Sequence, residues 1–514
     1  MKPHRFFISL TLEMLLAAMP FVPTASIYAQ EKIPETTATS QGGIARLQER
    51  LEAIEAKLRS LESRLDDMQR DRADKPEKSS GPQSVPAATP GANAAAVQKA
   101  TIEEQFEALD QKLRVIERRR ELEQETAAEK QKETATVTVG KDGFSLTSAD
   151  KNFQLKFDGY LQADNRSFVG QPSPALETFQ IGRARPVFQG TIFKYFDFKI
   201  MPDFAGGQTV LQDLHLDFNY FPAAKFRFGK TKSPLGLEVL QGDTDLTFVA
   251  RAFPSLLLPV RDVGAQVYGD LRAGALSYAF GVFNGVPDGT SSDMDTNDGK
   301  EIVGRIFAHP FKNSSFEVLK GLGAGIGGST GKQLGSLPSF KTSGQAVFFT
   351  YNSGVTADGE RYRFSPQAYY YLGSFGLLTE YAYSSQEVRK AAGLGAVQNR
   401  GWQVAASYVL GGKPSYRAVS PKRSFNPKEG GLGALEFTTR YSDLRVDKEA
   451  FSSGYADITK SAKQASAFVL GLNWYMAKMV KFVVNYEQTR FQGGSLQGNR
   501  PTEHAILSRF QIGF

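Results

Sequence analysis

The sequence predicts an all-β transmembrane barrel of about 16 antiparallel strands, preceded by an N-terminal α-helical coiled-coil region. Three observations support this fold class. Apolar and polar residues alternate with a period of two from about residue 153 to the C-terminus. Helices are too few to cover so much sheet, so closure in a membrane is the way to satisfy its backbone. Before residue 70 the apolar period is helical instead.

The last ten residues, AILSRFQIGF, show the strand pattern most clearly. One face holds apolar residues such as Ile506 and Phe510 and ends in Phe514, while the other carries Arg509 and Gln511. A single strand of this kind could belong to a water-soluble core. Its repetition along the chain favours a barrel with lipid outside and water inside.

Composition limits the chemistry of the chain. No run of 18 apolar residues is present among its 514 residues, so a helical membrane span is not predicted. There is no cysteine and there are four scattered histidines, so we expect no disulfide, no metal and no other cofactor. The net charge of +7 comes with no nucleic-acid motif, so it predicts no nucleic-acid partner and favours an anion-conducting lumen.

The N-terminal segments are expected to serve export and association. Residues 1–29 read as a signal peptide, with Lys2 and Arg5 before an apolar stretch and Ala29 at the cleavage site. Residues 44–70 form a predicted coiled coil that permits a trimer, although a single amphipathic helix on another surface would show the same pattern. Residues 71–97 are a Pro/Ala-rich linker. A second helical segment covers 98–133, with a shorter apolar seam at Ile102, Phe106, Leu109, Leu113 and Ile116.

Sixteen strands are predicted between residues 153 and 514, joined by connections that alternate between short and long. Residues 346–351 resemble a strand, but we assign them to a long outer loop because they would make the number of strands odd. Residues 411–431 are a long connection where a short turn is expected. Long connections are expected after Phe168, Gly236, Gly285, Lys390, Arg445 and Phe491. The strands are predicted to start at Phe153, Phe179, Phe196, Thr209, Lys225, Asp262, Leu276, Lys300, Phe316, Arg361, Phe375, Asn399, Leu432, Ser466, Val480 and Ala505.

The connection 237–260 is the best candidate for narrowing the bore. It mixes apolar residues such as Phe248 and Phe253 with Asp243, Asp245 and Arg251, which is unusual for a loop in water. We predict that it folds into the bore, with a lid on the outer rim or a surface for a neighbouring subunit as alternatives.

Several ordered blocks then resemble a known family. They include GRARPVFQGTIFKYFDFKIMPDFAGG at 182–207, FRFGKTKSPLGLE at 226–238, RDVGAQVYGDL at 261–271 and the terminal LSRFQIGF. Between residues 153 and 514 the chain resembles the phosphate-selective porin O/P family of Gram-negative outer membranes. The resemblance implies a homotrimeric porin in the outer membrane lipid that passes phosphate, polyphosphate or other small anions. The helical N-terminal region is not part of the family's core pattern; we expect it in the periplasm, where it could reach the cell wall.

Basic side chains on the inward faces are the candidate anion-binding residues, because arginine donates two parallel hydrogen bonds to phosphate and lysine adds a point charge. Lys230 and Lys232 precede the long loop and need a bulge to turn inward, and Arg251 is the one basic residue in mid-loop. The period of two places eight arginines on the bore side: Arg183, Arg185, Arg227, Arg305, Arg361, Arg363, Arg440 and Arg509.

Other functions are weaker alternatives. His215 stands between Asp213 and Asp217, but alternate residues of a strand form a row and not a cage for a metal. An enzyme would need a nucleophile paired with a base, which the four histidines do not suggest, so no catalytic residue is predicted. A general diffusion porin without phosphate selectivity, or a barrel that only tethers the outer membrane to the cell wall, remains open.

Overall fold

The computed structural model describes residues 56, 59, 63, 92–140, 143–170, 174–295 and 297–514. The chain divides into two units, Met1–Asp110 and Gln111–Phe514. The predicted signal peptide and nearly all of the predicted coiled coil lie outside the described residues. Helix α3 (Ala92–Glu133) begins inside the predicted linker, at a run of alanines that favours helix. No described helix is long and apolar enough to cross a membrane.

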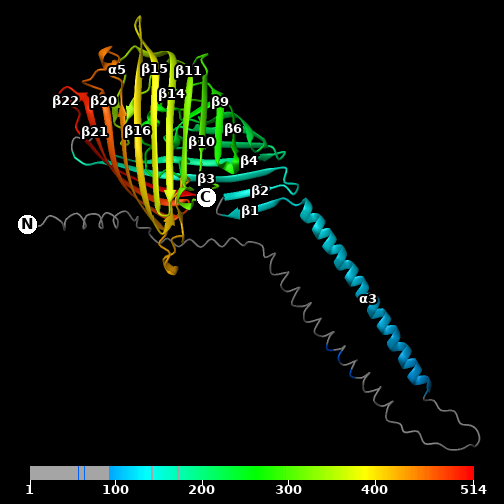
Figure 1. Ribbon diagram of the computed structural model, residues 1–514. Coiled ribbons are helices and arrows are strands. Elements are labelled where there is room, and N and C mark those ends of the chain that lie inside the picture. Colours follow the sequence, from blue (N-terminus) through cyan, green and yellow to red (C-terminus); the bar gives the residue numbers. More distant parts are fainter. Residues whose placement is uncertain are drawn as a thin grey trace, which may run out of the picture. The chain divides into compact units, whose positions relative to one another are not determined.

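Sixteen antiparallel strands form a closed barrel, which confirms the barrel part of the predicted fold. Figure 1 shows how the strands surround the interior. Each strand pairs with the next along the barrel. The last strand then pairs with the first, from Ala505 opposite Phe168 to Gly513 opposite Tyr160. The strands are β3 (Gln154–Phe168), β4 (Thr178–Ile192), β5 (Phe196–Asp203), β6 (Val210–Phe221), β7 (Ala224–Lys232), β8 (Arg261–Leu271), β9 (Leu276–Phe283), β10 (Glu301–Ala308), β11 (Leu322–Gly335), β14 (Val355–Leu372), β15 (Phe375–Lys390), β16 (Gly393–Leu410), β19 (Ala434–Arg445), β20 (Ala462–Ala477), β21 (Val480–Ser495) and β23 (Glu503–Gly513).

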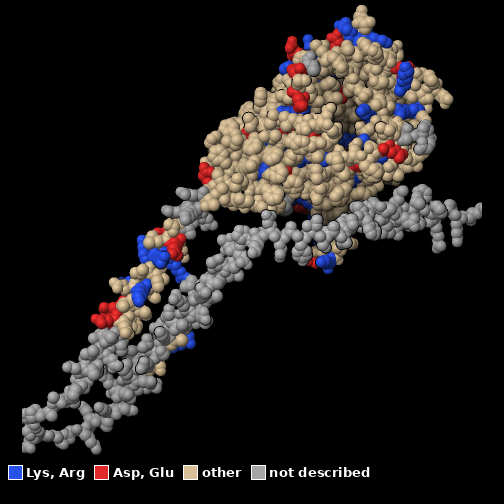
Figure 2. Space-filling model, turned by 180° about the vertical axis from the view of Figure 1, so that it is seen from behind, with Lys and Arg blue, Asp and Glu red and all other residues tan. Residues whose placement is uncertain are grey.

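Along each strand, successive side chains point alternately to the outer surface of the barrel and to its interior. In β6, Leu214 and Leu216 are exposed on the outer surface, whereas Asp213, His215 and Asp217 are buried inside. The outer wall in Figure 2 carries few charged side chains, and Lys, Arg, Asp and Glu gather mainly toward the rim. An apolar outer band with a polar interior is the arrangement that a bilayer requires.

A hairpin precedes the barrel. Strands β1 (Thr136–Gly140) and β2 (Gly143–Thr147) pair with each other, and β2 pairs with the first residues of β3. The terminal residue Phe514 lies beside this hairpin: its N–H donates to the carbonyl oxygen of Gly159 at 3.1 Å, and its ring centroid lies 6.4 Å from that of Phe144. The barrel end that holds the C-terminus is called the turn end here, and the opposite end is the loop end.

Four strand predictions differ from the structure. The predicted long connection after Lys390 is a two-residue turn at 391–392, because β15 and β16 continue as a tall hairpin. The strand predicted at Phe316 begins at Leu322, after the short helix η3 (Glu317–Leu319). β14 and β16 begin six residues before the predicted Arg361 and Asn399, since both continue their pairing with β15 beyond the predicted starts. The other short helices and a last hairpin strand are η2 (Arg272–Gly274), η4 (Pro427–Glu429), α5 (Glu449–Ser452) and β22 (Gly498–Asn499).

The segment 346–351 lies outside the barrel sheet, as predicted, but it is not a loop in water. Strand β13 (Val347–Phe349) pairs with β12 (Phe340–Lys341), and both Phe348 and Phe349 are fully buried. The Phe348 ring lies 5.6 Å from that of Phe253 in the connection 233–260. An apolar core therefore fills part of the barrel at the loop end.

The long turn 411–433 also has structure of its own. Strands β17 (Gly412–Lys413) and β18 (Ser420–Pro421) form a small separate sheet at the turn end. Tyr416, between them, is half-buried and its ring stacks on Tyr369 of β14, with centroids 5.1 Å apart. The unexpected length of this connection is thus explained by a turn that packs against the inner wall.

Candidate functional site

The connection 233–260 is the third loop at the loop end, and it runs through the barrel interior, as predicted. It contains α4 (Leu237–Leu240) and η1 (Phe253–Leu257). Wall residues bind its backbone from several sides: Gln367 of β14 donates to Leu235 at 2.8 Å, and Asn485 of β21 accepts from Val249 at 2.8 Å. These contacts satisfy polar groups that would otherwise be buried without partners. We call residues 233–260 the inner loop.

Asp243 fixes one side of the inner loop through four arginines. Its carboxylate accepts a 2.5 Å hydrogen bond from Arg251 and a further one from Arg185. Arg183 and Arg261 each approach it at 3.5 Å. Burial alone would raise the pKa of Asp243, but the surrounding Arg and Lys charges outweigh burial and hold the pKa well below its ordinary value. Arg183, Arg185 and Arg251, all predicted to bind anions, therefore share one buried carboxylate.

Arg440 fixes the opposite side. Its guanidinium donates to the carbonyl oxygen of Ala250 at 2.9 Å, lies 3.4 Å from the Glu238 carboxylate and covers the Phe248 ring at 4.3 Å. The N–H of Leu237 donates to Glu380 of β15 at 2.5 Å. Arg440 points inward, as the period of two indicates, and its contacts are with the inner loop and, at 3.7 Å, with Glu487 of β21.

The other predicted arginines also lie inside the barrel, mostly beside acids. Arg361 and Arg363 contact Glu301 at 2.5 and 2.7 Å, and Arg363 also contacts Asp288 at 2.7 Å. Two of the pairs are bidentate, with both distances 2.7 Å in each: Arg227 with Asp217, and Arg509 with Asp164. Such pairs offset much of the positive charge that the sequence assigns to the bore.

Arg305 differs from these pairs. Its guanidinium donates to the amide oxygen of Gln367 at 2.9 Å and lies 4.6 Å from the Phe307 ring centroid. Both partners are electrically neutral, so the charge of Arg305 is not offset by these contacts. Its side chain also lines the large cavity at the turn end.

Lys230 and Lys232 lie at the end of β7, and their side chains make different contacts. They follow Gly229, whose φ of 122° departs from regular strand geometry. Lys230 donates to Asp293 and to the carbonyl oxygen of Leu211, the latter at 2.7 Å. Its ammonium group is therefore occupied by these two acceptors. Lys232 donates to the carbonyl oxygen of Gln241 at 2.5 Å and lines the cavity. Only the second of the two predicted lysines therefore faces the cavity.

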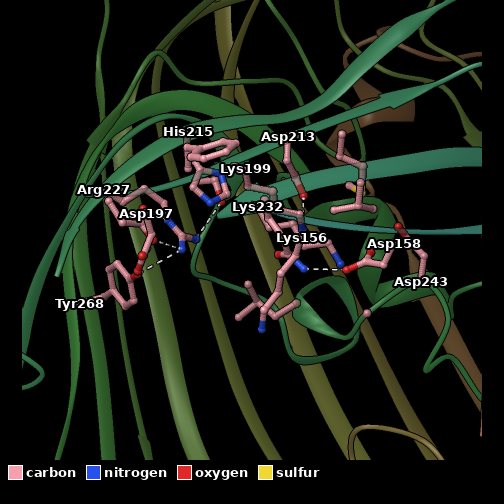
Figure 3. A pocket seen from close by; sticks show the side chains of 18 of the residues that line it. Lys156, Asp158, Asp197, Lys199, Asp213, His215, Arg227, Lys232, Asp243 and Tyr268 are labelled. Carbon is pink, nitrogen blue, oxygen red and sulfur yellow. Dashed lines mark hydrogen bonds and ion pairs between the residues drawn. The ribbon is translucent and has the colours of Figure 1, made fainter. Parts of the chain in front are cut away.

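The cavity has a volume of about 1110 Å³ and lies between the inner loop and the turn end (Figure 3). Its lining reaches Met479 and Phe514 at the turn end, and its upper wall includes Gly242 and Thr244 of the inner loop. Eight Lys and Arg side chains and six Asp side chains line it, which leaves an excess of positive charge. The basic residues are Lys156, Lys199, Arg227, Lys232, Arg261, Arg305, Arg417 and Lys478.

Five of these eight were missed by the sequence reasoning. Lys156, Lys199 and Arg261 lie on strands, and their alternation with outward residues could have revealed them. Arg417 and Lys478 lie in turns, where the period of two carries no information. Lys199 forms a 2.9 Å ion pair with Asp213, so its charge is partly offset.

His215 lies on the cavity wall, and its Nδ1 has no hydrogen-bond partner among the described residues. The carboxylates beside it are engaged by cations: Asp213 by Arg261 at 2.8 Å and Asp217 by Arg227. The three residues of β6 thus form the polar row that the sequence predicts.

Tyr416 links the turn end to the inner loop. Its backbone carbonyl accepts a 2.8 Å hydrogen bond from Gln241, and its neighbour Arg417 lines the cavity. Burial raises the pKa of Tyr416 well above its ordinary value, so this hydroxyl stays protonated and can donate. The cavity is therefore bounded by the inner loop on one side and by the turn 411–433 on another.

Comparison with known proteins gives a family match over the whole barrel. The family model for phosphate-selective porin O and P matches residues 153–514. Porin O of Pseudomonas aeruginosa is 23% identical over 393 residues, covering 69% of this chain and 87% of that protein. Among solved structures, the outer membrane channel DcaP of Acinetobacter baumannii is similar with a TM-score of 0.48 and 10% identity, over 73% of this chain and 99% of DcaP. The anion-selective porin from Comamonas acidovorans has a TM-score of 0.45 and 12% identity, over 70% of this chain and 100% of that porin.

Proposed function

We propose, from the premise that the chain belongs to the phosphate-selective porin O and P family, that this outer-membrane porin prefers small anions and passes inorganic phosphate or polyphosphate. The path of the anion includes the cavity beneath the inner loop. The alternative is a general diffusion porin without phosphate selectivity.

The observation that carries the proposal is the lining of the cavity. Basic side chains exceed acidic ones there, and the hydrogen bonds of Lys232 and Arg305 go to neutral oxygens. An anion that loses part of its hydration in a narrow pore needs fixed positive charge and donors to replace it. Arg305 can provide both without first breaking an ion pair, and Lys232 adds a hydrogen-bond donor.

The paired arginines have a different part in this proposal. Arg183, Arg185, Arg251 and Arg440 hold the inner loop, so they shape the path and contribute less of its net charge. The acids among them also keep anion binding weak, because each cation is shared. Conduction needs sites that an ion can leave as readily as it enters, so a weak and distributed field suits a porin.

The test compares Lys232→Gln with Lys230→Gln in the purified porin in planar bilayers. Both variants replace one lysine at the same strand end with a neutral side chain, but only Lys232 faces the cavity. We expect Lys232→Gln to lower the reversal potential in a chloride gradient and to weaken block of chloride current by phosphate. Lys230→Gln should change both quantities less.

A control variant distinguishes an effect on the ion path from a general effect of removing a charge. Lys422→Gln removes a charge from the turn 411–433 that does not line the cavity, and it should have little effect beyond the Debye length of about 8 Å. A cation-selective wild-type pore would contradict the proposal. Equal effects of Lys230→Gln and Lys232→Gln would also contradict it and leave a general diffusion porin.

We also propose that the porin is a homotrimer whose N-terminal helices associate. Along the described part of α3, the seam residues Phe106, Leu109, Leu113 and Ile116 are exposed, with 54% or more of each side chain accessible. Apolar residues in this spacing are stabilised when a second helix covers them. Contact of these helices with the cell wall belongs to the same proposal, with pull-down of purified peptidoglycan by the full chain as its test.

A further inference from the structure

The β1–β2 hairpin has a feature that anion passage does not explain. It lies outside the sixteen-stranded ring, yet it is built onto it: β2 pairs with β3 from Gln154 to Phe157, just below the point where β23 ends opposite Tyr160. The hairpin thus takes over the edge of β3 that the last strand leaves free. It extends the barrel sheet sideways by two strands at the turn end.

The register divides the hairpin into two chemically distinct faces. Val137 lies opposite Leu146, and Val139 lies opposite Phe144. Phe144 in turn lies opposite Phe157 of β3. The residues between them on the opposite face of the hairpin are Thr136, Thr138, Ser145 and Thr147.

The apolar face continues the outer wall of the barrel. Phe157 lies opposite Phe188 of β4, and the ring centroids of these two residues are 5.0 Å apart. Phe144 and Phe514 join the same group of rings. The row of outward side chains therefore runs without interruption from the barrel wall across β2 to Val139 of β1.

Nothing among the described residues covers this face. Val137 and Val139 are 69% and 66% exposed, and Phe144 and Leu146 are 47% exposed each. Four apolar residues of a small hairpin are more exposed than water favours. Their cover must therefore come from outside the described chain.

We propose that the apolar face of the β1–β2 hairpin inserts into the lipid monolayer at the turn end of the barrel. The inference depends on the outer-membrane location of the porin, but not on its anion preference. Lipid is the favoured occupant because the face is continuous with the apolar, exposed outer wall of the barrel. The rings of Phe144, Phe157 and Phe514 match the aromatic girdle that barrels place at the membrane interface.

The free edge of β1 determines how deeply the hairpin enters the membrane. β1 pairs with β2 alone among the described strands, so its other edge leaves backbone N–H and C=O groups without strand partners. Such groups are too costly in the hydrocarbon core but can bind water and headgroups at its boundary. The hairpin therefore lies at the level of the headgroups, with valine, leucine and phenylalanine toward the acyl chains and the threonines toward water.

The absence of cysteine in the chain makes a site-specific test direct. Val139→Cys and Val137→Cys place an environment-sensitive fluorophore on the apolar face of the full-length porin, and Thr138→Cys places it on the opposite face. The porin is reconstituted in phosphatidylcholine vesicles, with and without phosphatidylcholine that carries a nitroxide near the glycerol backbone. Lipid nitroxide should quench the labels at 137 and 139 about twofold more than the label at 138. Iodide in the buffer should show the opposite order.

Two results would overturn the proposal. Equal iodide quenching at 138 and 139 would mean that the hairpin stands in water. A label at 139 that is shielded from both iodide and lipid nitroxide, together with a disulfide between two copies of Val139→Cys, would mean that a neighbouring subunit covers the face. Conductance of the same labelled samples is measured separately, so a failed anion preference and a failed membrane contact are distinguished.

Discussion

The hydroxyl group of Tyr416 donates a 2.7 Å hydrogen bond to the backbone carbonyl of Leu237. Leu237 belongs to the inner loop, which enters from the loop end, whereas Tyr416 belongs to a turn at the opposite end. Two segments from opposite sides of the membrane therefore meet inside the barrel. A change in the turn can thus alter the geometry of the loop.

Tyr416→Phe removes this hydrogen bond and keeps the ring that stacks on Tyr369. We expect a stability loss of about 1 kcal/mol and larger fluctuations of the open-channel current, because the inner loop loses one support. Single-channel recording and denaturant unfolding in vesicles measure the two effects. Tyr408→Phe is the matched control, since Tyr408 is exposed on the outer wall. Identical recordings for Tyr416→Phe and the native porin would show that the two segments are independent.

Asp243→Asn should release one side of the inner loop. The substitution leaves Arg183, Arg185, Arg251 and Arg261 close together without their shared carboxylate. Breaking a buried ion pair in this way costs about 3–5 kcal/mol, so we expect lower stability and noisier currents. Asp358→Asn also removes an acid beside an arginine, Arg389, but at a half-exposed site where about 0–1 kcal/mol is expected. Equal destabilisation by the two substitutions would argue against the role of Asp243.

The same carboxylate predicts how the pore responds to acid. The pKa of Asp243 in the folded protein lies well below its ordinary value of 3.8. Ionised Asp243 therefore stabilises the fold at every pH above that ordinary value, and this stabilisation is lost only as the pH falls through the lower, folded-state pKa. We expect the contacts of Asp243, and the low current noise that depends on them, to persist from about pH 7 to about pH 4. A rise in noise near pH 5 that Asp243→Asn abolishes would contradict this expectation.

Arg509 provides a test of the difference between an anion site and a structural pair. Arg509→Gln leaves Asp164 buried without its partner, for which we expect a loss of about 3–5 kcal/mol. The double variant Arg509→Met with Asp164→Leu removes both charges and should recover most of that stability. Its reversal potential should match that of the native porin, because the net charge of the wall is unchanged. A large loss of anion preference in the double variant would instead indicate that Arg509 acts on the permeating anion.

The helical seam predicts a change in association without a change in the barrel. Leu109→Asp should reduce chemical crosslinking between N-terminal helices of the full-length porin, since a charge would be buried between helices. Gln111→Asp adds the same charge two residues away, outside the seam, and should leave crosslinking intact. Undiminished crosslinking of Leu109→Asp would remove the basis for this helical contact.

The period of two was sufficient to predict the barrel, because it tells which face of each strand meets lipid. It placed Arg440 and Arg509 inside correctly, since an inward face is a property of one strand. It gave no information on their partners. Asp164 lies on the first strand and Glu238 on a loop, so the pairs that neutralise these arginines become visible only when the sheet is closed.

The same limit explains the segments that were placed less well. Residues 346–351 are apolar enough for a strand and are buried, but they lie in the interior and not in the wall, a distinction that hydropathy does not record. The turn at 391–392 needs only two residues, with Ala391 at a φ of 51°. Neither of these two residues is glycine or proline, so the sequence predicts a longer loop. The Pro-rich turn 411–433 was recognised as an anomaly, but its packing against Tyr369 depends on tertiary contacts.

The closed ring has a consequence for the order of folding. The backbone carbonyl of Asp243 accepts a hydrogen bond from Gln162 on the first strand, and that of the adjacent Thr244 accepts one from Gln511 on the last. These two glutamines come together only after the ends of the sheet have joined. The inner loop therefore reaches its final position late in biogenesis. In a barrel that fails to close, the inner loop also fails to narrow the bore. Assembly machinery that senses closure would thereby keep unselective, leaky pores out of the membrane.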